Sequence, residues 1–195
     1  MNLDNIDWDK VNGLVPAIVQ DFKSSQVLML GYMNKEALEN TINTNFVHFY
    51  SRTKKRLWKK GETSGNVLLL NDIQLDCDRD TLLIKASNEG PTCHLDQYSC
   101  FGEEEFNISK LEKIIESRLD NPSEESYTSS LFNKGIKEIA KKVTEEAGEV
   151  SISAVSNDGR VIEESADLLF HLLVLLKNQN IGFENIIGEL EKRSG

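Results

Sequence analysis

The stretch Val27-Leu28-Met29-Leu30-Gly31-Tyr32-Met33 leads without a break into Asn34 and Lys35-Glu36-Ala37-Leu38, and it decides how the first half folds. A short run of mostly apolar residues predicts a buried strand. Asn34 then predicts a helix over residues 35–42, because its side-chain oxygen can cap the first helical turn. Similar apolar runs at residues 14–20, 46–50, 67–70 and 81–86 predict further strands. The first half is therefore predicted to be mainly β, with one short helix.

The pattern becomes helical after the acidic stretch Glu103-Glu104-Glu105. Apolar residues recur every three or four positions over residues 108–119, as they do on the buried face of a helix. Longer helical patterns cover residues 131–155 and 160–178, and a short one follows Gly182. The segment 160–178 is apolar nearly all round, which predicts burial on several sides. Because so few helices make a thin bundle alone, we expect them to pair with a second copy of the chain.

These two patterns predict an α+β protein with two domains, residues 1–105 and residues 106–195. The chain has 195 residues and a net charge of −10, which argues against nucleic acid as a partner. A small phosphate-bearing substrate stays compatible with that charge if a basic patch or a metal neutralises it. The apolar runs are too short to span a membrane, and the first residues do not resemble a signal peptide. We therefore expect no membrane partner and a cytoplasmic location.

The three cysteines of the chain all lie in one short segment, as Cys77, Cys93 and Cys100. In a cytoplasmic chain such clustered thiols are more typical of metal ligands than of disulfides. Three ligands leave the fourth position of a tetrahedral zinc ion open for water, which is the catalytic arrangement. His94 could be a fourth ligand or a proton-transfer group. We favour the second role, because neighbouring side chains of an extended segment point apart. A redox thiol set and buried core cysteines remain alternatives.

Three aspartates alternate with other residues around the first cysteine, as Asp76, Asp78 and Asp80. In an extended segment their carboxylates would share one face, and Cys77 would point to the other. Carboxylate oxygens suit Mg²⁺, whereas thiolates suit Zn²⁺. One segment can therefore supply ligands to two different metal sites. A solvated acidic loop is the alternative.

A basic run stands out in this acidic chain, and it consists of Arg52, Lys54, Lys55, Arg56, Lys59 and Lys60. Trp58 lies inside the run, and Gly61-Glu62-Thr63-Ser64-Gly65-Asn66 follows it. Glycines let backbone N–H groups approach an anion, and the two hydroxyl side chains can donate to phosphate oxygens. An aromatic ring beside cations suits a nucleotide. A solvated basic hairpin turn is the alternative for this segment.

Several motifs of the first half occur together in one enzyme family. They are residues 27–34, 56–66 and 76–80, then Gly90-Pro91-Thr92-Cys93-His94 and Ser99-Cys100-Phe101. Over residues 14–101 the chain resembles the phosphoribosyl-AMP cyclohydrolases of histidine biosynthesis, which hydrolyse the N1–C6 bond of the adenine ring in phosphoribosyl-AMP.

That resemblance implies a set of roles for the residues that match the family. It implies Zn²⁺ on Cys77, Cys93 and Cys100, with the ligands shared across a homodimer. It implies Mg²⁺ on Asp76, Asp78 and Asp80, and a general base or acid at His94. Its substrate contacts would be Arg52, Trp58, Lys60, Gly61, Glu62, Thr63, Ser64 and Gly65.

Acidic residues recur at helical spacing in the second half, as Glu145, Glu146, Glu149, Glu164 and Asp167. If the two helices that carry them are antiparallel, these acids can face each other across the bundle. Clustered carboxylates repel one another without a cation, so Mg²⁺ is the natural partner. A solvated acidic face is the alternative. Asp167 argues against it, because it adjoins the apolar segment that starts at Leu168.

The spacing of these acids resembles the all-α nucleotide pyrophosphohydrolases. Ser126-Tyr127-Thr128, Ile139-Ala140-Lys141-Lys142-Val143 and residues 166–176 narrow the resemblance, over residues 108–192, to the phosphoribosyl-ATP pyrophosphohydrolases. It implies a C-terminal all-α helical bundle of the nucleotide pyrophosphohydrolase type, which releases pyrophosphate. The implied catalytic acids are Glu145, Glu146, Glu149, Glu164 and Asp167, with Mg²⁺ on Glu146, Glu149 and Asp167. The implied phosphate contacts are Lys142, Lys134 and Lys141.

One residue departs from that pattern, because Thr144 stands where the family usually has glycine. The carboxylates are intact, so we expect activity to survive. The two resemblances fit consecutive steps, in which phosphoribosyl-ATP loses pyrophosphate and phosphoribosyl-AMP is then ring-opened. The sequence therefore predicts a bifunctional hydrolase. The alternative is a general nucleoside-triphosphate pyrophosphohydrolase fused to a structural zinc-binding module.

Overall fold

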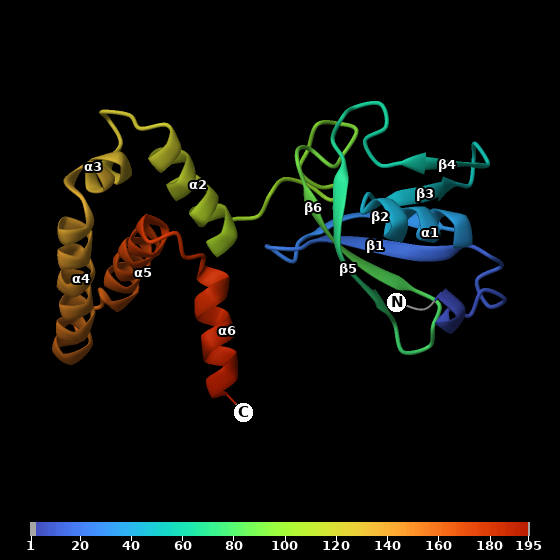
Figure 1. Cartoon of the computed structure of the whole chain (residues 1–195). Coiled ribbons are helices and arrows are strands. Elements are labelled where there is room, and N and C mark those ends of the chain that lie inside the picture. Colours follow the sequence, from blue (N-terminus) through green and yellow to red (C-terminus); the bar gives the residue numbers. More distant parts are fainter. Residues whose placement is uncertain (1–2, 195) are drawn as a thin grey trace. The chain divides into compact units, whose positions relative to one another are not determined.

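The computed structural model of the chain describes residues 3–194. The chain divides into two compact units, Met1–Glu105 and Phe106–Gly195. The strands of the described residues all lie in the first unit, and the second unit is helical (Figure 1). The predicted α+β class is confirmed, with a mainly-β first half that carries a short helix and a helical second half.

A four-stranded sheet with the order β2-β1-β6-β5 forms the centre of the first unit. Its strands are β1 (Val15–Asp21), β2 (Val27–Met33), β5 (Leu68–Leu75) and β6 (Leu82–Asn88). β1 pairs in parallel with β6, and the other two pairings are antiparallel. Every second residue of β1 is buried, as expected for a strand with one face on the core.

The remaining elements of the first unit cover this sheet and form a separate hairpin. They are a 3₁₀ helix η1 (Leu3–Asn5), the helix α1 (Lys35–Thr44) and a two-stranded sheet of β3 (His48–Ser51) and β4 (Arg56–Lys59). The Asn34 side chain accepts a hydrogen bond from the backbone N–H of Ala37 at 2.9 Å, so the predicted cap is present. β4 was not predicted, because its sequence Arg56-Leu57-Trp58-Lys59 reads as a basic loop rather than an apolar run.

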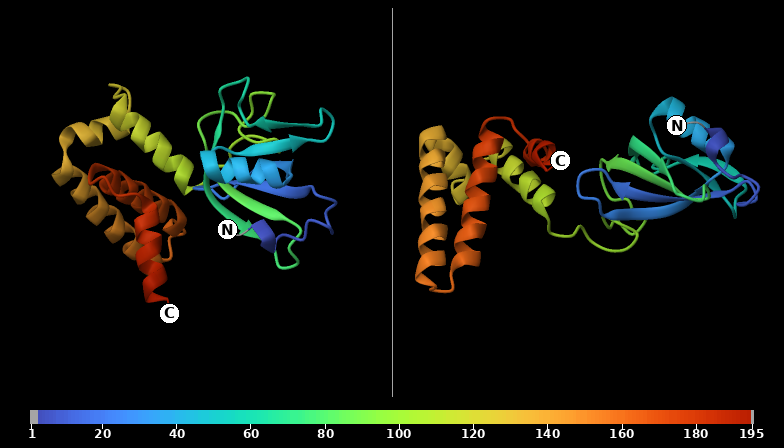
Figure 2. Two further views of the ribbon diagram at one scale, coloured as in Figure 1. Left: turned by 45° about the vertical axis from the view of Figure 1, so that its right-hand side comes forward. Right: turned by 90° about the horizontal axis from the view of Figure 1, so that it is seen from below.

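Five helices form the second unit over the residues that the structure describes. They are α2 (Ile108–Asp120), α3 (Tyr127–Lys134), α4 (Ile136–Ser156), α5 (Val161–Asn178) and α6 (Phe183–Arg193). α4 and α5 lie side by side, joined by a short turn (Figure 2). The small core of the helical unit consists of Ile115, Leu131, Ile139, Leu173 and Val174.

The predicted helix over residues 131–155 is wrong at its start, because the structure has two helices there. Gly135 ends α3 and begins α4 with a φ of 84°, a left-handed backbone that breaks the helical path. The break lets α3 turn so that Leu131 is buried while Tyr127 stays half exposed.

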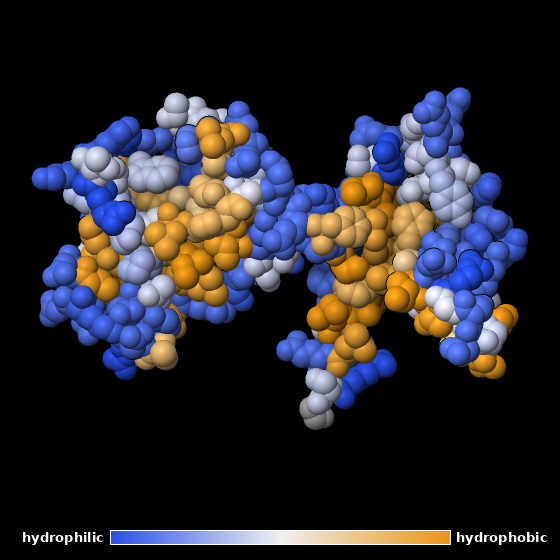
Figure 3. All heavy atoms as spheres, turned by 180° about the vertical axis from the view of Figure 1, so that it is seen from behind, coloured by the Kyte–Doolittle hydropathy of each residue, from blue (hydrophilic) through white to orange (hydrophobic). Residues whose placement is uncertain are grey.

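Apolar side chains remain exposed on both units, as the view from behind shows (Figure 3). In the helical unit they include Ile152, Val155 and Ile162, which lie near the turn between α4 and α5. Within residues 3–194, the helices are too short or too polar to cross a lipid bilayer.

Candidate active sites

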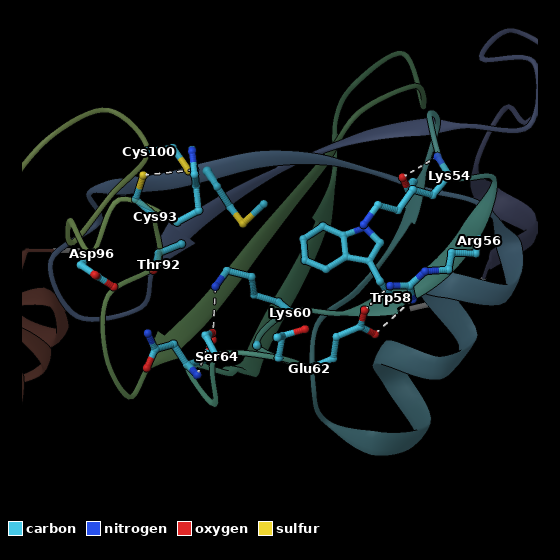
Figure 4. A pocket seen from close by; sticks show the side chains of 16 residues that line it. Lys54, Arg56, Trp58, Lys60, Glu62, Ser64, Thr92, Cys93, Asp96 and Cys100 are labelled. Carbon is cyan, nitrogen blue, oxygen red and sulfur yellow. Dashed lines mark hydrogen bonds and ion pairs between the residues drawn. The ribbon is translucent and has the colours of Figure 1, made fainter.

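A pocket of about 560 Å³ in the first unit brings together part of the basic run, most of the glycine segment and two cysteines (Figure 4). Its walls come from β3, β4, the loop that follows β4 and the loop over residues 92–100. The lining residues are Met29, Ser51, Lys54, Arg56, Trp58, Lys60, Gly61, Glu62, Thr63, Ser64, Asn66, Thr92, Cys93, His94, Asp96 and Cys100.

The hairpin holds one wall of this pocket rigidly. Phe49 and Trp58 face each other across the register of β3 and β4, with ring centroids 5.2 Å apart. Phe49 is fully buried, so it fixes the indole ring from behind. Arg56 forms an ion pair with Glu62, and this contact ties the strand to the glycine segment.

Lys60 is an unusual pocket residue, because its side chain is buried although it carries a charge. Its ammonium group donates to the backbone carbonyl of Asn66 at 3.2 Å. Burial lowers the pKa of Lys60, and the thiols of Cys100 and Cys93 act in the opposite direction. Lys60 therefore lies close enough to both thiols to interact with them.

The two pocket cysteines lie next to each other. Desolvation and interaction with Cys93 both raise the pKa of the Cys100 thiol. The Nδ1 atom of His94 is 3.8 Å from the Cys93 sulfur. Cys77, in contrast, is exposed and lies outside the pocket lining, in the turn after β5. Within one chain, therefore, two of the three predicted sulfur ligands share the pocket, and the third lies outside it.

The segment of residues 76–80 is a turn, so the predicted extended conformation is wrong. The Asp76 carboxylate accepts hydrogen bonds from the backbone N–H groups of Asp80 at 2.9 Å and Thr81 at 3.1 Å. Arg79 adopts a left-handed φ of 66° to close this turn. The turn nevertheless gathers the predicted carboxylates, because oxygens of Asp76, Asp78 and Asp80 lie within 4.8 Å of one another.

A lysine from the N-terminal segment partly neutralises this aspartate group. The Lys10 ammonium lies 2.5 Å from Asp78 and 2.6 Å from Asp80. These hydrogen bonds raise the pKa of Lys10, and the pKa of Asp78 falls in return. A divalent cation on this group would share its ligands with Lys10.

Most predicted substrate contacts of the first unit line the pocket, and two do not. The guanidinium carbon of Arg52 lies 3.8 Å from the ring centroid of Tyr32, outside the lining, and Gly65 is also outside it. Sequence reasoning missed Asn66 and Thr92 as lining residues. Asn66 follows Thr63-Ser64-Gly65, and Thr92 directly precedes Cys93. Their closeness to these motifs is the only feature of the sequence that could have indicated that they line the pocket.

The helical unit gathers a second carboxylate group between α4 and α5. Oxygens of Glu146, Glu164 and Asp167 lie within 4.8 Å of one another, and the two glutamates are only 5% and 3% exposed. Buried carboxylates cost free energy unless a cation compensates them. Glu149 belongs to the same row, because a hydrogen bond with Glu164 raises the pKa of Glu149.

Two cations flank this carboxylate row. Lys142 lies 3.0 Å from Glu145 and 3.1 Å from Glu146, and these contacts raise the pKa of Lys142. Arg160 lies 2.5 Å from Glu164 at the other end. Arg160 was not predicted, because only its pairing with Glu164 one helical turn later gives it a role.

A tyrosine and a histidine complete the Lys142 end of the row. The Tyr127 hydroxyl is 2.9 Å from Nε2 of His171, and Nδ1 of His171 is 2.8 Å from the backbone carbonyl of Asp167. The same Nδ1 lies 3.7 Å from a carboxylate oxygen of Glu146. His171 is buried, and Tyr127 is about half exposed.

The donor atoms of the sites fit different metal ions. Hard carboxylate oxygens in groups of three match the ligands that Mg²⁺ and similar cations take in proteins. The neighbouring sulfurs of Cys93 and Cys100 match a softer ion. Within residues 3–194, the groups of three candidate ligands within 4.8 Å of one another are the two carboxylate groups.

Comparison with known proteins matches each unit separately. Residues 29–102 match the family model of phosphoribosyl-AMP cyclohydrolase, and residues 108–194 match that of phosphoribosyl-ATP pyrophosphohydrolase. A "Histidine biosynthesis bifunctional protein HisIE" of Vibrio cholerae is 52% identical, covering 97% of this chain and 94% of its own. Proteins of the same name from Buchnera aphidicola (54%, 98% and 95%) and Campylobacter jejuni (47%, 97% and 95%) are also similar.

Fold, sites and family matches together define a two-domain nucleotide hydrolase of amino-acid biosynthesis. The chain belongs to the family of bifunctional HisIE proteins of histidine biosynthesis. It carries phosphoribosyl-ATP pyrophosphohydrolase and phosphoribosyl-AMP cyclohydrolase activities. The predicted bifunctional hydrolase is therefore confirmed, in preference to a general pyrophosphohydrolase fused to a structural zinc-binding module. Enzymes of the cyclohydrolase family use metal ions.

Proposed function

We propose that residues 1–105 open the adenine ring of phosphoribosyl-AMP and that residues 106–195 release pyrophosphate from phosphoribosyl-ATP. The observation that carries the first assignment is the shared pocket. It places cations, an indole ring and hydroxyl donors on one wall and Cys93, His94 and Cys100 on the other. Binding a nucleotide requires cations and a stacking surface such as those of the first wall. Hydrolysis at a ring carbon requires groups that activate water and transfer protons, such as those of the second.

Ring opening requires water and two proton transfers. The water oxygen bonds to C6, the C6–N1 bond breaks, the oxygen remains in the carboxamide, and N1 receives a proton. We assign the proton transfers to His94, which lies in the pocket beside Cys93. Trp58 and Lys60 orient the nucleotide. A zinc ion on the cysteines would supply water that ionises near neutral pH.

We further propose that the third sulfur ligand comes from a second copy of the chain. Cys93 and Cys100 line the pocket of one chain while Cys77 stands outside it, exposed to solvent. Because a homodimer repeats each contact by symmetry, Cys77 of each copy would complete the site of the other. The exposed apolar side chains on both units are compatible with such an assembly.

Mixing two inactive variants tests this proposal. Cys77→Ser and Cys93→Ser should each abolish ring opening alone and leave pyrophosphate release intact. Co-refolded in equal amounts, half of the dimers are mixed and each has one intact site of two, so about a quarter of the activity should return. If the mixture stays as inactive as its components, the ligands do not come from two chains. If Cys77→Ser alone is active, Cys77 is not a ligand.

For the second unit we propose that Glu146, Glu164 and Asp167 hold Mg²⁺, with Glu149 beside them. The observation that carries this is the burial of two carboxylates within 4.8 Å of a third. A divalent cation there would neutralise the triphosphate and the acids together. Lys142 keeps the ends of Glu145 and Glu146 in place through its two ion pairs. The Asp76, Asp78 and Asp80 group would hold Mg²⁺ for the first unit.

Replacing Glu146 by glutamine tests the second assignment. Pyrophosphate release should fall at least about a hundredfold, because a metal ligand is lost, and Mg²⁺ binding measured by calorimetry should weaken. Ring opening of supplied phosphoribosyl-AMP should stay unchanged. Glu138→Gln is the matched control, since Glu138 lies on the same helix and pairs only loosely with Lys141 at 3.9 Å. Full pyrophosphate release by Glu146→Gln would refute the assignment.

We also propose a cytoplasmic location, because three free cysteines persist as thiols in a reducing compartment.

A further inference from the structure

The carboxylate row between α4 and α5 has two chemically different ends. Glu149 pairs with Glu164, while Glu146 lies near His171, so the two helices run antiparallel along the row. Arg160 therefore marks one end. Lys142 marks the other, together with the Tyr127 and His171 pair.

The Tyr127 end offers a fixed aromatic surface. The Nδ1 atom of His171 faces a carbonyl oxygen, which can only accept, so Nδ1 carries the proton and Nε2 accepts from the Tyr127 hydroxyl. The Tyr127 ring also packs on Phe170, with centroids 6.4 Å apart and an angle of 28°. It meets His171 edge-on at 5.9 Å. Held by these contacts, the ring is still 51% exposed, so it can receive a planar group without reorganising.

The Arg160 end offers a charged group instead. Its side chain is 62% exposed, and Glu164 and Glu163 hold the guanidinium at 2.5 Å and 3.5 Å. The planar guanidinium retains donors that can bind phosphate oxygens in pairs.

We propose that the triphosphate substrate lies along this row with its nucleoside end at Tyr127 and its two leaving phosphates at Arg160. The proposal rests on the assignment of the row to pyrophosphate release. In this orientation the oxygen that bridges the α and β phosphorus atoms lies over Glu146 and Asp167, at the middle of the row. Water attacks one of these two phosphorus atoms, which gains the water oxygen as its bond to the bridging oxygen breaks. The protons of the water pass to the product phosphates or to solvent, and pyrophosphate leaves at the Arg160 end.

Product inhibition tests this orientation, because each product carries one end of the substrate. The full-length enzyme is assayed by chromatography of phosphoribosyl-ATP consumption, with AMP or inorganic pyrophosphate as the added inhibitor. Tyr127→Ala should raise the inhibition constant of AMP about tenfold, since a stacking surface is lost, and change that of pyrophosphate less than about twofold. Arg160→Gln should show the opposite pattern.

Control variants separate this orientation from general damage. Tyr127→Phe keeps the ring and should keep AMP inhibition, and Tyr127→Leu replaces Tyr127→Ala if the latter loses its helical circular dichroism. Arg193→Gln is the matched arginine control, because Arg193 pairs with Glu189 at the same helical spacing, 2.9 Å apart on α6. It should change neither inhibition constant.

Two results would overturn the orientation. One is the reverse pattern, in which Tyr127→Ala weakens pyrophosphate and Arg160→Gln weakens AMP. The other is equal weakening of both inhibitors by both variants. The Glu146→Gln experiment separates these outcomes from an error in the assignment of the site. If Glu146→Gln loses pyrophosphate release but the Tyr127 and Arg160 variants do not affect the two inhibitors differently, the site assignment stands and only the proposed orientation is refuted.

Discussion

Replacing Gly61 by alanine should slow ring opening about a hundredfold and leave pyrophosphate release unchanged. Gly61 lines the pocket and has a φ of 84°, a left-handed conformation that costs an alanine roughly 1 kcal/mol. A Cβ built on Gly61 would stand 2.7 Å from the backbone nitrogen of Val67 and 2.5 Å from the carbonyl carbon of Asn66. Both neighbours are backbone atoms, so they cannot give way by rotating a side chain.

The expected magnitude follows from how far the loop must move. Ordinary contact begins at 3.4 Å, so the segment around Asn66 has to shift by roughly 0.7 to 0.9 Å. A misplacement of about 1 Å in a substrate-positioning group can cost about a hundredfold in rate. Lys60 moves with the loop, because its ammonium donates to the carbonyl of Asn66. The assay compares ring opening of supplied phosphoribosyl-AMP with pyrophosphate release from phosphoribosyl-ATP in the same preparation.

Gly65 supplies a matched control in the same loop. Its φ is 81°, but a Cβ there would meet no atom within 4 Å among the residues that the structure describes. Gly65→Ala should therefore have the backbone cost of roughly 1 kcal/mol without the collision, and ring opening should fall only a few-fold. If both alanine variants slow ring opening equally, the collision is irrelevant. If Gly61→Ala is fully active, the loop does not position substrate.

Three further predictions concern stability and pH. Thr92→Val should raise the free energy of unfolding of the first unit by about 1 kcal/mol, because within the described chain the buried Thr92 hydroxyl has no hydrogen-bond partner. Urea unfolding followed by tryptophan fluorescence measures this, since both tryptophans lie in that unit, and a destabilised variant would contradict it. Gly31→Ala should lower the same quantity by about 2 kcal/mol, because its Cβ would collide with the Phe49 ring, and unchanged unfolding would refute it. Asp158→Asn should lower the melting temperature of the helical unit at pH 7. A hydrogen bond from Ser153 lowers the pKa of Asp158, so its stabilisation is present above the usual carboxyl pKa and is lost as the pH falls through the lowered value. Melting curves that differ equally at pH 7 and at about pH 2.5 would refute this.

Local patterns in the sequence were enough to predict the helices and most strands, but not the conformation of short polar segments. The alternation of Asp76, Asp78 and Asp80 correctly suggested that the carboxylates meet. The reason was different, because Asp76 binds two backbone N–H groups and folds the segment into a turn. The same chemistry is common to aspartates at turns, so side-chain competition for the backbone overrode the alternating pattern. At Gly135 the reverse occurred, since a helical apolar pattern continued through a glycine that ends one helix and starts another.

Contacts between distant residues lay beyond local reasoning. Tyr127 and His171 are separated by 44 positions, and nothing in the residues around either one indicates the pairing. Cys77, Cys93 and Cys100 likewise look equivalent as residue types. Only the fold separates the two that share a pocket from the one that stands apart. Residue types were therefore enough to predict a chemistry for each site, while the tertiary arrangement determined its geometry.

The buried polar residues set the two proposed sites apart from the rest of the described chain. Several other buried polar groups are satisfied within the chain, as when the Ser129 hydroxyl donates to the carbonyl of Arg118 and the Ser99 hydroxyl to that of Val27. These contacts tie turns and helix ends, and they complete the hydrogen bonding of the groups involved. At the proposed sites, the charges of the buried groups are not fully compensated by their neighbours. Lys60 is buried beside two thiols, and Glu146 and Glu164 are buried within reach of a third carboxylate.

A protein selected only for stability would replace such groups with apolar side chains, because incompletely compensated charges reduce the free energy of unfolding. Their retention at both sites is explained if charged ligands complete the balance. Under the proposed assignments, an anionic nucleotide would offset the buried ammonium of Lys60 in the pocket of the first unit. In the helical unit, a divalent cation with a triphosphate would offset the carboxylate row. The groups that need compensation therefore have opposite signs, a buried ammonium in the first unit and buried carboxylates in the second.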